Sequence, residues 1–436
     1  MVIHRKHIYP EKDLALPRTL HDDRHRLEQV EVPVVTVSAS FRQDIAKNLH
    51  EHTRKKGEIV FSRAHYSMAV AILDEARRQN LSAWLVDPIN FLSADQWQRL
   101  VRIELIGQLT ARIPILKKIK DIFDTFIRKQ VPLKGAIDKP LEYVTTRVEK
   151  PIVSVHYESG NFLARHGKKV LQIVTDPHVR PHYLFEAGRP NISFAVFDEA
   201  TRKSFFAKAA GQNLELAPDK VVVTGPPVDP RIIETRKGKK ADSYKKRGLR
   251  LVVTTSGLGT NYKEIEELLT GLLPAVKERK IELLLYASTH RDFRKMYLDK
   301  AAENGLSAGD ENAKTQVRVI WDESIVTANQ KLIEHAFGWA DGFITKPSGD
   351  MAYDASAAGC FLLTLSPWGE WEENIFDIFT RLGIAKAADI NNFVEQLDSL
   401  EKENWFSRAI NNALNIDDIF LNGAKNIVDL QQNWKP

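Results

Sequence analysis

The chain contains a single cysteine, Cys360, among its 436 residues. One thiol cannot form a disulfide within the chain, so a disulfide-stapled extracellular scaffold is excluded. No apolar run approaches the ~18 residues that a helix needs to span a bilayer. The segment Met1–Lys12 is charged and has no apolar centre, so we expect no secretory signal. Together these absences predict a cytoplasmic protein.

The chain also has little net charge, because its 62 Lys and Arg residues are nearly balanced by 57 Asp and Glu residues, which gives a formal net charge of +5. Such a small excess says less about binding partners than the places where cations gather. One basic run, Arg236–Arg250, is poor in apolar residues and is predicted to be a solvated linker. A nucleic-acid binder that uses this run is an alternative, but no RNA- or DNA-binding motif accompanies it, so we expect no nucleic-acid partner.

Short apolar runs alternate with helical segments along the chain. The apolar fraction of 43% and the length predict two domains of about 200 residues each. The strands predicted before the linker are Val34–Ser38, Glu58–Ser62, Ala83–Val86, Ile152–Val155, Val170–Thr175, Ile192–Val196 and Lys220–Thr224. Helices are predicted at Arg42–Thr53 and Ser67–Gln79, with a loop at residues 63–66 between strand and helix. Strand–loop–helix repeats of this length indicate doubly wound parallel sheets.

A new strand, Arg250–Thr254, opens a second set of such units after the linker. The sequence therefore predicts an α/β fold with two Rossmann-like domains that face each other across a cleft. The predicted limits are 1–232 for the first domain, 233–249 for the linker, 250–410 for the second domain and 411–436 for C-terminal helices.

The most informative segment is Gly342–Phe376, GFITKPSGDMAYDASAAGCFLLTLSPWGEWEENIF. It is typical of strand, tight polar loop, helix, strand, polar loop and helix in succession. Pro347 fixes φ and Gly349 accepts positive φ, so residues 346–349 are predicted to form a turn. Two polar loops that follow neighbouring parallel strands meet at one edge of the sheet, where α/β proteins bind nucleotides.

Three pieces of this segment, ITKPSG, YDASAAG and GEWEEN, carry a family resemblance. They are similar in spacing, and partly in residues, to the patterns I-T-K-x-G-G, S-E-A-x-A-x-G and G-Q-E-x-x-N. The segment thus resembles the donor-sugar site of GT-B glycosyltransferases, in the branch with monogalactosyldiacylglycerol synthase and the peptidoglycan N-acetylglucosaminyltransferase. The resemblance extends over roughly Glu58–Ala385.

The resemblance implies a GT-B fold and an inverting, metal-independent hexosyltransferase. The implied substrate is a nucleotide-diphosphate sugar, with UDP as the expected nucleotide, and no cofactor is expected. No Asp-x-Asp motif lies at a predicted strand end, which argues against the metal-dependent GT-A fold. By analogy of fold, the helices of residues 411–436 are expected to cross back to the first domain.

The resemblance also suggests how the donor is held. Asp354 matches a family Glu that binds the ribose hydroxyls, although it is one methylene shorter. The alternative is a helix carboxylate that faces solvent. Ser348 and Gly349 would offer a hydroxyl and a main-chain N–H to the diphosphate, and Lys346 would add positive charge.

A second loop with glycines, Gly257 and Gly259, lies between a predicted strand and a predicted helix. Main-chain N–H groups in such a loop can approach an anion, and related enzymes place a G-x-G loop against the diphosphate. The alternative is a plain turn that binds nothing.

Sugar recognition is expected in the loop after the next strand. Glu370 occupies the family's Gln position, Trp371 occupies the neighbouring acidic position, and Asn374 matches the end of the pattern. Glu373 is expected to supply the displaced carboxylate. The alternative is a solvated acidic turn.

His65 is the candidate base, in the segment SRAHYSMAVAIL. The family pattern is G-G-G-H, so the histidine is kept and the three glycines are lost. A histidine titrates near neutrality and can take a proton from an acceptor hydroxyl. The alternative is that His65 caps the following helix or packs in the cleft.

Asp176, in the segment IVTDPHVRPHY, resembles the family's V-T-D and is expected to orient His65 or to bind the acceptor. His182, in the same loop, matches a family histidine on the acceptor side. His178 and His182 do not predict a zinc site, since no Cys or further His lies at ligand spacing, so no metal is expected.

The acceptor side is suggested by Val101–Val131, where one predicted helical stripe is apolar and its flanks are basic. The residues expected to contact the acceptor or the membrane are Ile115, Lys117, Lys118, Ile119, Phe123 and Phe126. Such a helix can lie on an anionic membrane surface. We therefore expect a lipid or lipid-linked acceptor and a peripheral location on the inner face of the membrane. The alternative is a helix that packs on its own domain.

Three other functions remain open on this sequence. One is a GT-B enzyme with a soluble acceptor, and another is a nucleotide-sugar epimerase on the same fold. The third is a non-catalytic nucleotide-sugar-binding protein, which the lost glycines before His65 and the missing Gln at position 370 favour.

Overall fold

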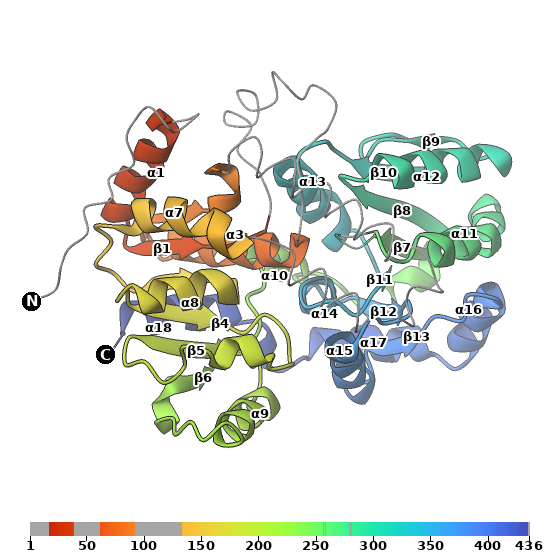
Figure 1. Ribbon diagram of the computed structural model, residues 1–436. Helices are drawn as coiled ribbons and strands as arrows, with labels where there is room; N and C mark the ends of the chain where they lie inside the picture. Colours follow the sequence, from red (N-terminus) through yellow and green to blue (C-terminus); the bar gives the residue numbers. More distant parts are fainter. Residues whose placement is uncertain are drawn as a thin grey trace, which may run out of the picture.

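The computed structural model describes residues 17–38, 62–91, 133–255, 257, 259–278 and 281–434. The predicted helix Arg42–Thr53, all but the last residue of the predicted strand Glu58–Ser62, and the apolar–basic segment Val101–Val131 lie outside the described residues. Two lobes lie side by side in Figure 1, and each consists of a sheet flanked by helices.

The first sheet has six strands in the order β2-β1-β3-β4-β5-β6, and every neighbouring pair is parallel. The strands are β1 Val32–Val35, β2 Ala83–Val86, β3 Ile152–Ser154, β4 Val170–Ile173, β5 Ile192–Val196 and β6 Val221–Val223. The chain moves outward from β1 to β2 and then returns to place β3 on the other side of β1. This reversal makes a topological switch point between β1 and β3.

The first lobe is covered by helices that the chain supplies before and between these strands. They are α1 Pro17–Gln29, α3 Arg63–Arg78, η2 Pro88–Phe91, α7 Leu133–Thr145, α8 Tyr157–Arg165, η3 Pro181–Leu184, α9 Glu199–Ala210 and η4 Pro218–Lys220. The prediction of a loop at residues 63–66 is wrong, because these residues form the first turn of α3. Ser62 caps this turn, since its side-chain oxygen accepts from the main-chain N–H of His65 at 3.3 Å.

The second sheet has seven strands in the order β13-β12-β11-β7-β8-β10-β9, again all parallel. The strands are β7 Leu249–Thr254, β8 Ile281–Ser288, β9 Ala308–Gly309, β10 Val317–Trp321, β11 Gly342–Thr345, β12 Phe361–Thr364 and β13 Ala385–Ala387. Its switch point lies between β7 and β11. The predicted α/β fold with two doubly wound parallel sheets is confirmed.

Two short helices, α10 Pro230–Thr235 and η5 Ser243–Lys246, lie in the segment that joins the sheets. The remaining helices are α11 Tyr262–Lys277, α12 Arg291–Glu303, α13 Ile325–Leu332, the π-helical turn η6 Ile333–Phe337, α14 Met351–Ala357, α15 Glu370–Arg381, α16 Phe393–Lys402, α17 Trp405–Leu414, η7 Asp418–Phe420 and α18 Gly423–Gln432.

The last helix, α18, lies in the first lobe, next to α3 and β1 (Figure 1). The side chain of Gln431 is buried there and donates to the carbonyl oxygens of Glu31 and Pro151, at 3.0 and 2.9 Å. At the start of the helix a Cβ on Gly423 would lie 1.9 Å from the carbonyl oxygen of Pro226. The chain therefore passes so close to its own earlier segment that only glycine fits at this position.

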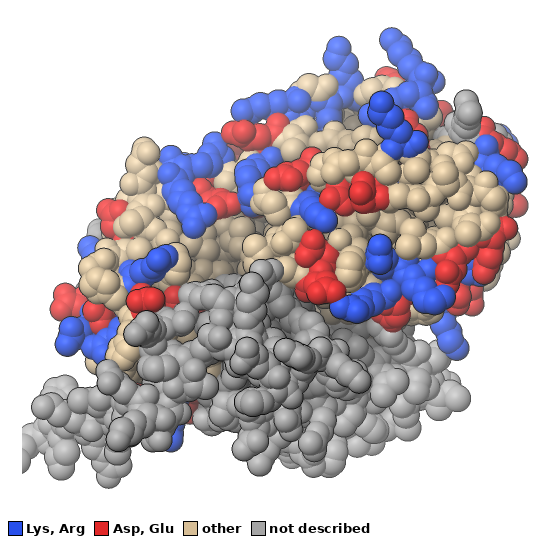
Figure 2. Space-filling view, turned by 90° about the horizontal axis from the view of Figure 1, so that it is seen from above, with Lys and Arg blue, Asp and Glu red and all other residues tan. Residues whose placement is uncertain are grey.

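On the described part of the face shown in Figure 2, Lys and Arg side chains are interspersed with Asp and Glu side chains. This distribution agrees with the small net charge of +5. Within the described ranges, no helix has both the length and the apolar character that crossing a bilayer requires.

Candidate functional site

A cleft of about 360 Å³ lies between the two lobes. Thr254 and Thr345, at the carboxyl ends of β7 and β11, line it from the second lobe, and His156 and Tyr157, which follow β3, line it from the first lobe. The cleft is thus bordered by the switch points of both sheets, which is where α/β folds bind ligands.

Hydroxyl groups cover the base of the cleft on the second lobe. Because β7 and β11 are parallel neighbours, Thr254 and Thr345 lie side by side, and the Thr254 hydroxyl donates to Oγ1 of Thr345 at 2.6 Å. Thr255 and Thr260 line the cleft next to them. These neutral groups can both donate and accept hydrogen bonds, which suits phosphate oxygens and sugar hydroxyls.

Three cations line the cleft, and each lies beside a carboxylate. The pairs are Arg63 with Asp350 at 2.5 Å, Lys346 with Glu372 at 2.7 Å, and Arg180 with Asp176 at 3.7 Å. The cations are therefore fixed in position before any ligand arrives.

Arg63 joins the two lobes. Its side chain is 4% exposed and comes from the first turn of α3 in the first lobe. It pairs with Asp350, in the loop after β11, and donates to Oδ1 of Asn329 at 3.0 Å. A buried guanidinium is thereby held directly beside the predicted diphosphate loop.

Lys346 lines the cleft, at the carboxyl end of β11, and its side chain is 8% exposed. Its partner Glu372 belongs to α15 and also accepts from the main-chain N–H of Trp368 at 2.5 Å. The loops after β11 and β12 are thus tied together by one lysine and one glutamate.

The side chains predicted to bind the sugar, Glu370, Glu373 and Asn374, do not line the cleft. Glu370 is 71% exposed, Glu373 is exposed, and Asn374 donates to the carbonyl oxygen of Pro177 at 3.1 Å. Since α15 begins at Glu370, positions 370 and 373 share the outer face of the helix and position 372 points inward. Of the three glutamates, Glu372 is therefore the one whose carboxylate this loop presents to the cleft.

Trp371, from the same turn, does line the cleft. The guanidinium carbon of Arg180, from the first lobe, lies 4.7 Å from the centre of its ring. This cation–π contact joins the two lobes on the side of the cleft next to α15.

Asp354 also lies away from the cleft. It is 4% exposed in α14 and does not belong to the cleft lining. Burial, with a smaller contribution from Asp350, raises the pKa of its carboxyl well above the usual range, so the neutral form is favoured. Packing of α14 thus turns the Asp354 side chain inward, and it does not reach the surface of the cleft.

Ser348 and Gly349 lie in the cleft lining as predicted. The Ser348 hydroxyl donates to Oδ1 of Asp350 at 2.8 Å. A Cβ on Gly349 would lie 2.7 Å from both the Oδ1 atom of Asp176 and the carbonyl oxygen of Thr175. The loop after β11 therefore touches the first lobe at a point where only a glycine fits.

The other glycine loop approaches the first lobe in the same way. Gly257 lines the cleft, and a Cβ on it would lie 3.3 Å from the main-chain nitrogen of Arg63. Its carbonyl oxygen lies 3.0 Å from Nε2 of His290. Gly259 has a φ of +63° and is buried outside the cleft lining, so its contribution is to the shape of the turn.

His65 lines the cleft opposite these loops. Its Nε2 atom lies 3.3 Å from the Thr175 hydroxyl, and its ring meets the edge of His156 with centroids 5.2 Å apart. Burial lowers the pKa of His65 to about 4, and the positive charge of Arg180 acts in the same direction. The imidazole is therefore neutral at neutral pH, and burial makes it a weaker base than a solvent-exposed histidine.

Asp176 follows β4 and also lines the cleft. Burial raises the pKa of its carboxyl to about 6, against the opposing charge of Arg180. Thr175 and not Asp176 provides the hydrogen-bond contact with His65. The predicted acceptor residue His182 lies behind Tyr157, stacked on its ring at 4.9 Å, and does not line the cleft.

No protein-family model matches the chain, and no curated protein is significantly similar to it in sequence. Several solved structures share its fold. MnaA of S. aureus, solved with UDP, aligns with a TM-score of 0.53 at 10% identity, over 92% of this chain and 96% of MnaA. A putative UDP-N-acetylglucosamine 2-epimerase from Listeria monocytogenes aligns with a TM-score of 0.51 at 11% identity, over 92% and 95% of the two chains. The fold is GT-B.

MurG of Acinetobacter baumannii aligns over 92% of this chain and 100% of its own, at 10% identity and a TM-score of 0.47. The two alignments with TM-scores above 0.5, at 10% and 11% identity, show the fold and not the reaction. Among the described residues, no group of three His, Cys, Asp or Glu side chains is arranged to hold a metal ion.

Sequence patterns missed several residues that line the GT-B cleft. They are Arg63, Arg180, Asp350, Trp368 and Glu372. Their positions in the sequence could have identified them, because charged residues directly after a strand or at the start of a helix lie at the ligand-binding edge of the sheet. Which of them turn inward is set by contacts between the lobes.

Proposed function

We propose that the cleft binds a nucleotide-diphosphate sugar, with UDP as the nucleotide, and that the protein transfers the sugar to an acceptor. The observation that carries this proposal is the fixed position of Arg63 and Lys346 at the β7–β11 switch point, under two glycine loops. A diphosphate needs fixed positive charge and close main-chain approach, and both are available there.

The ion pairs suggest how the protein accommodates the ligand. In the free protein Asp350 and Glu372 hold the two cations in place. When a diphosphate takes over the cations, these carboxylates become acceptors for hydroxyl groups of the ribose and the sugar. The same cations then stabilise the negative charge that develops on the departing nucleoside diphosphate, without a metal ion.

The transfer itself is proposed to be a single displacement with inversion. The acceptor oxygen forms a bond with the anomeric carbon as the bond from that carbon to the diphosphate oxygen breaks, and the diphosphate leaves with the electron pair. His65 takes the acceptor proton. A bound diphosphate carries negative charge into the cleft and therefore raises the pKa of His65 from its value of about 4 in the free protein.

Binding is tested with a thermal-shift screen of UDP and UDP-sugars, followed by calorimetry. At a ligand concentration 100 times the Kd, binding adds about 2.7 kcal/mol to the free energy of unfolding. We expect this gain in wild type and in the control Lys314→Gln, whose lysine is exposed outside the cleft lining, and its loss in Lys346→Gln. Equal stabilisation of all three proteins would exclude the cleft as the donor site.

Transfer is tested by measuring UDP release with and without acceptors. Release that depends on an acceptor supports the glycosyltransferase. A change of sugar stereochemistry without any acceptor would instead identify an epimerase, and binding without turnover of any UDP-sugar would identify a non-catalytic binding protein.

We further propose a lipid or lipid-linked acceptor at an anionic membrane surface, on the apolar and basic pattern of Val101–Val131. Sedimentation with vesicles of phosphatidylcholine and phosphatidylglycerol tests this step. Wild type is expected to sediment with the vesicles, and Lys117→Glu/Lys118→Glu is expected to stay in the supernatant. Transfer to a water-soluble acceptor by a protein that binds no vesicles would refute the lipid acceptor and leave donor binding intact.

A further inference from the structure

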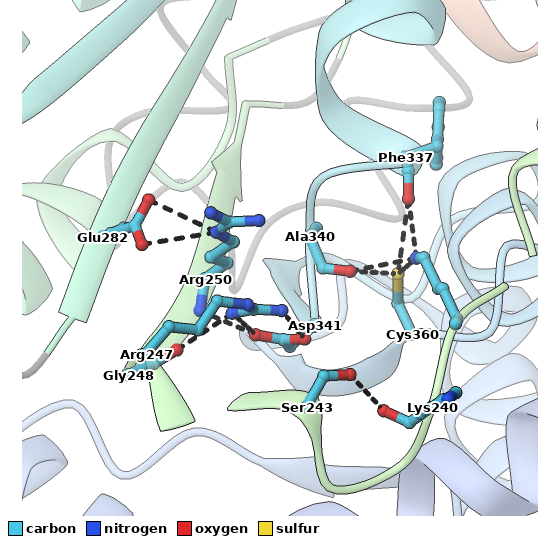
Figure 3. Close-up of polar contacts among 11 residues, drawn as sticks. Lys240, Ser243, Arg247, Gly248, Arg250, Glu282, Phe337, Ala340, Asp341 and Cys360 are labelled. Atoms are coloured by element: carbon cyan, nitrogen blue, oxygen red, sulfur yellow. Dashed lines mark hydrogen bonds and ion pairs between the residues drawn. The ribbon is translucent and has the colours of Figure 1, made fainter. Parts of the chain in front are cut away.

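A second cavity, of about 280 Å³, lies at the opposite, amino edge of the second sheet. It is formed by the segment that joins the lobes and by the residues that precede β7 and β11. Its charged lining residues are Lys237, Lys239, Lys240, Arg247, Arg250 and Asp341, and we call this site the linker pocket. Figure 3 shows four of them, Lys240, Arg247, Arg250 and Asp341. Five cations thus meet one carboxylate around a single cavity.

The two arginines of the linker pocket have carboxylate partners. Arg247 makes a two-pronged contact with Asp341, at 2.7 and 2.8 Å, and the Nε atom of Arg250 lies 3.3 Å from both carboxylate oxygens of Glu282 (Figure 3). The Glu282 side chain is 45% exposed, so the Arg250 pair is only weakly held. The arginines are thus oriented, and Arg250 remains available to a stronger anion.

Lys239 makes no ion pair with a carboxylate among the described residues. Its Nζ atom donates to the carbonyl oxygens of Phe337 and Ala340, at 2.7 and 2.9 Å, and lies 2.9 Å from Sγ of Cys360. Burial raises the pKa of the Cys360 thiol, so this third neighbour also stays neutral. Three neutral acceptors fix the ammonium group but leave its positive charge uncompensated at the pocket.

The other two lysines that line the pocket, Lys237 and Lys240, are exposed to solvent. Lys237 is 79% exposed, and its nearest carboxylate oxygen, on Glu234, lies 3.9 Å away. Lys240 is exposed and makes no ion pair with any residue that the structure describes. Long exposed lysines of this kind can close over an anion as it enters.

We propose that the linker pocket binds a small molecule that carries phosphate groups. Guanidinium forks and lysine ammonium groups are the donors that phosphate oxygens prefer, and both are present here. Trp339 also lines the pocket, and the guanidinium carbons of Arg250 and Arg318 lie 5.6 and 4.3 Å from the centre of its ring, so the indole supplies a flat wall beside the cations. The proposal is independent of the function proposed for the cleft.

Calorimetry with inorganic pyrophosphate tests the linker pocket once the cleft is weakened by Lys346→Gln. In that background we expect one bound pyrophosphate, and we expect Lys237→Glu/Lys240→Glu to lower its affinity about tenfold or more. The matched control is Lys169→Glu/Lys203→Glu, which makes the same change of net charge on exposed lysines of the first lobe. Absence of binding in the Lys346→Gln protein, or an equal loss in the control, would overturn the proposal.

Hydrogen exchange of the wild-type protein gives a second measurement that needs no substitution. Pyrophosphate is expected to slow exchange of main-chain amides in residues 236–243, which line or adjoin the pocket. Protection limited to the loops of the cleft would overturn the proposal even if pyrophosphate binds.

The phosphate has two possible sources, a soluble metabolite or a lipid headgroup. Vesicles of phosphatidylcholine with phosphatidic acid separate them. Sedimentation of wild type that is lost in Lys237→Glu/Lys240→Glu assigns a lipid phosphate, whereas a lower affinity of this variant for free pyrophosphate with unchanged sedimentation assigns a soluble ligand. If Lys237→Glu/Lys240→Glu changes neither the affinity for pyrophosphate nor the sedimentation with vesicles, the pocket is not a phosphate site.

Discussion

His65 and Asp176 line the same cleft, and burial moves their pKa values in opposite directions. For His65 the folded pKa of about 4 lies below its ordinary value of 6.5, so the native state binds fewer protons and stability rises with pH through this window. For Asp176 the folded pKa of about 6 lies above its ordinary value of 3.8, so stability falls with pH through nearly the same window.

Each of these differences corresponds to about 3 kcal/mol, since one pKa unit is worth 1.36 kcal/mol. The two effects therefore oppose each other in the wild-type protein between about pH 4 and pH 6.5. A single substitution removes one effect and exposes the other. Asp176→Asn, compared with wild type, is expected to gain about 3 kcal/mol in the free energy of unfolding as pH rises through this window. His65→Gln is expected to lose a similar amount.

The measurement is urea-induced unfolding, followed by tryptophan fluorescence, at half-unit steps from pH 4 to pH 8. Differences from wild type isolate the substituted group from all other titrations. The double variant, with both substitutions, should differ from wild type by an amount that hardly changes with pH. Difference curves that are flat for both single variants would refute the assignment of opposed, burial-driven shifts to this pair.

Three further predictions concern single positions. Gly349→Ala should push the lobes apart, because the added Cβ would lie 2.7 Å from a main-chain and a side-chain oxygen of the facing lobe. The radius of gyration measured by X-ray scattering should therefore increase. In the control Gly271→Ala the added Cβ meets no atom within 4 Å, so the radius should stay unchanged. A UDP-sugar should stabilise Asp354→Asn against heat as it does wild type, because Asp354 lies outside the cleft lining, whereas Lys346→Gln should lose this stabilisation. If both variants lose it, Asp354 contributes to donor binding. Cys360, with 0% exposure and a raised pKa, should react with Ellman's reagent only in urea, so a fast reaction of the native protein would contradict its burial.

Strand positions followed closely from the sequence. An apolar run bounded by turn residues predicted Ile192–Val196 with the limits that β5 has in the structure. This strand lies between two others and is largely buried, so its composition reports its environment directly. The start of α3 was missed by four residues, because the cap by Ser62 outweighs the polar character of its first turn.

The loops of the site could be found from the sequence, but not the direction of every side chain. The motif located Lys346 and Ser348 at the cleft, where strand ends fix them. The pattern did not show which glutamate faces the cleft, because the helical phase of α15 exposes Glu370 and turns Glu372, two positions later, inward. The pairing of Arg63 with Asp350 joins two lobes across a long sequence separation, and no local pattern encodes such a contact.

The position of α18 has a consequence for synthesis on the ribosome. The buried Gln431 bonds the start of the first sheet to the end of the chain, and Ile427 and Val428 fill part of the same core. A nascent chain that already contains every strand of the first sheet still lacks this helix while the whole second half is translated. The N-terminal lobe can therefore reach its final packing only after α18 has been synthesised, and until then the core positions that α18 covers stay exposed.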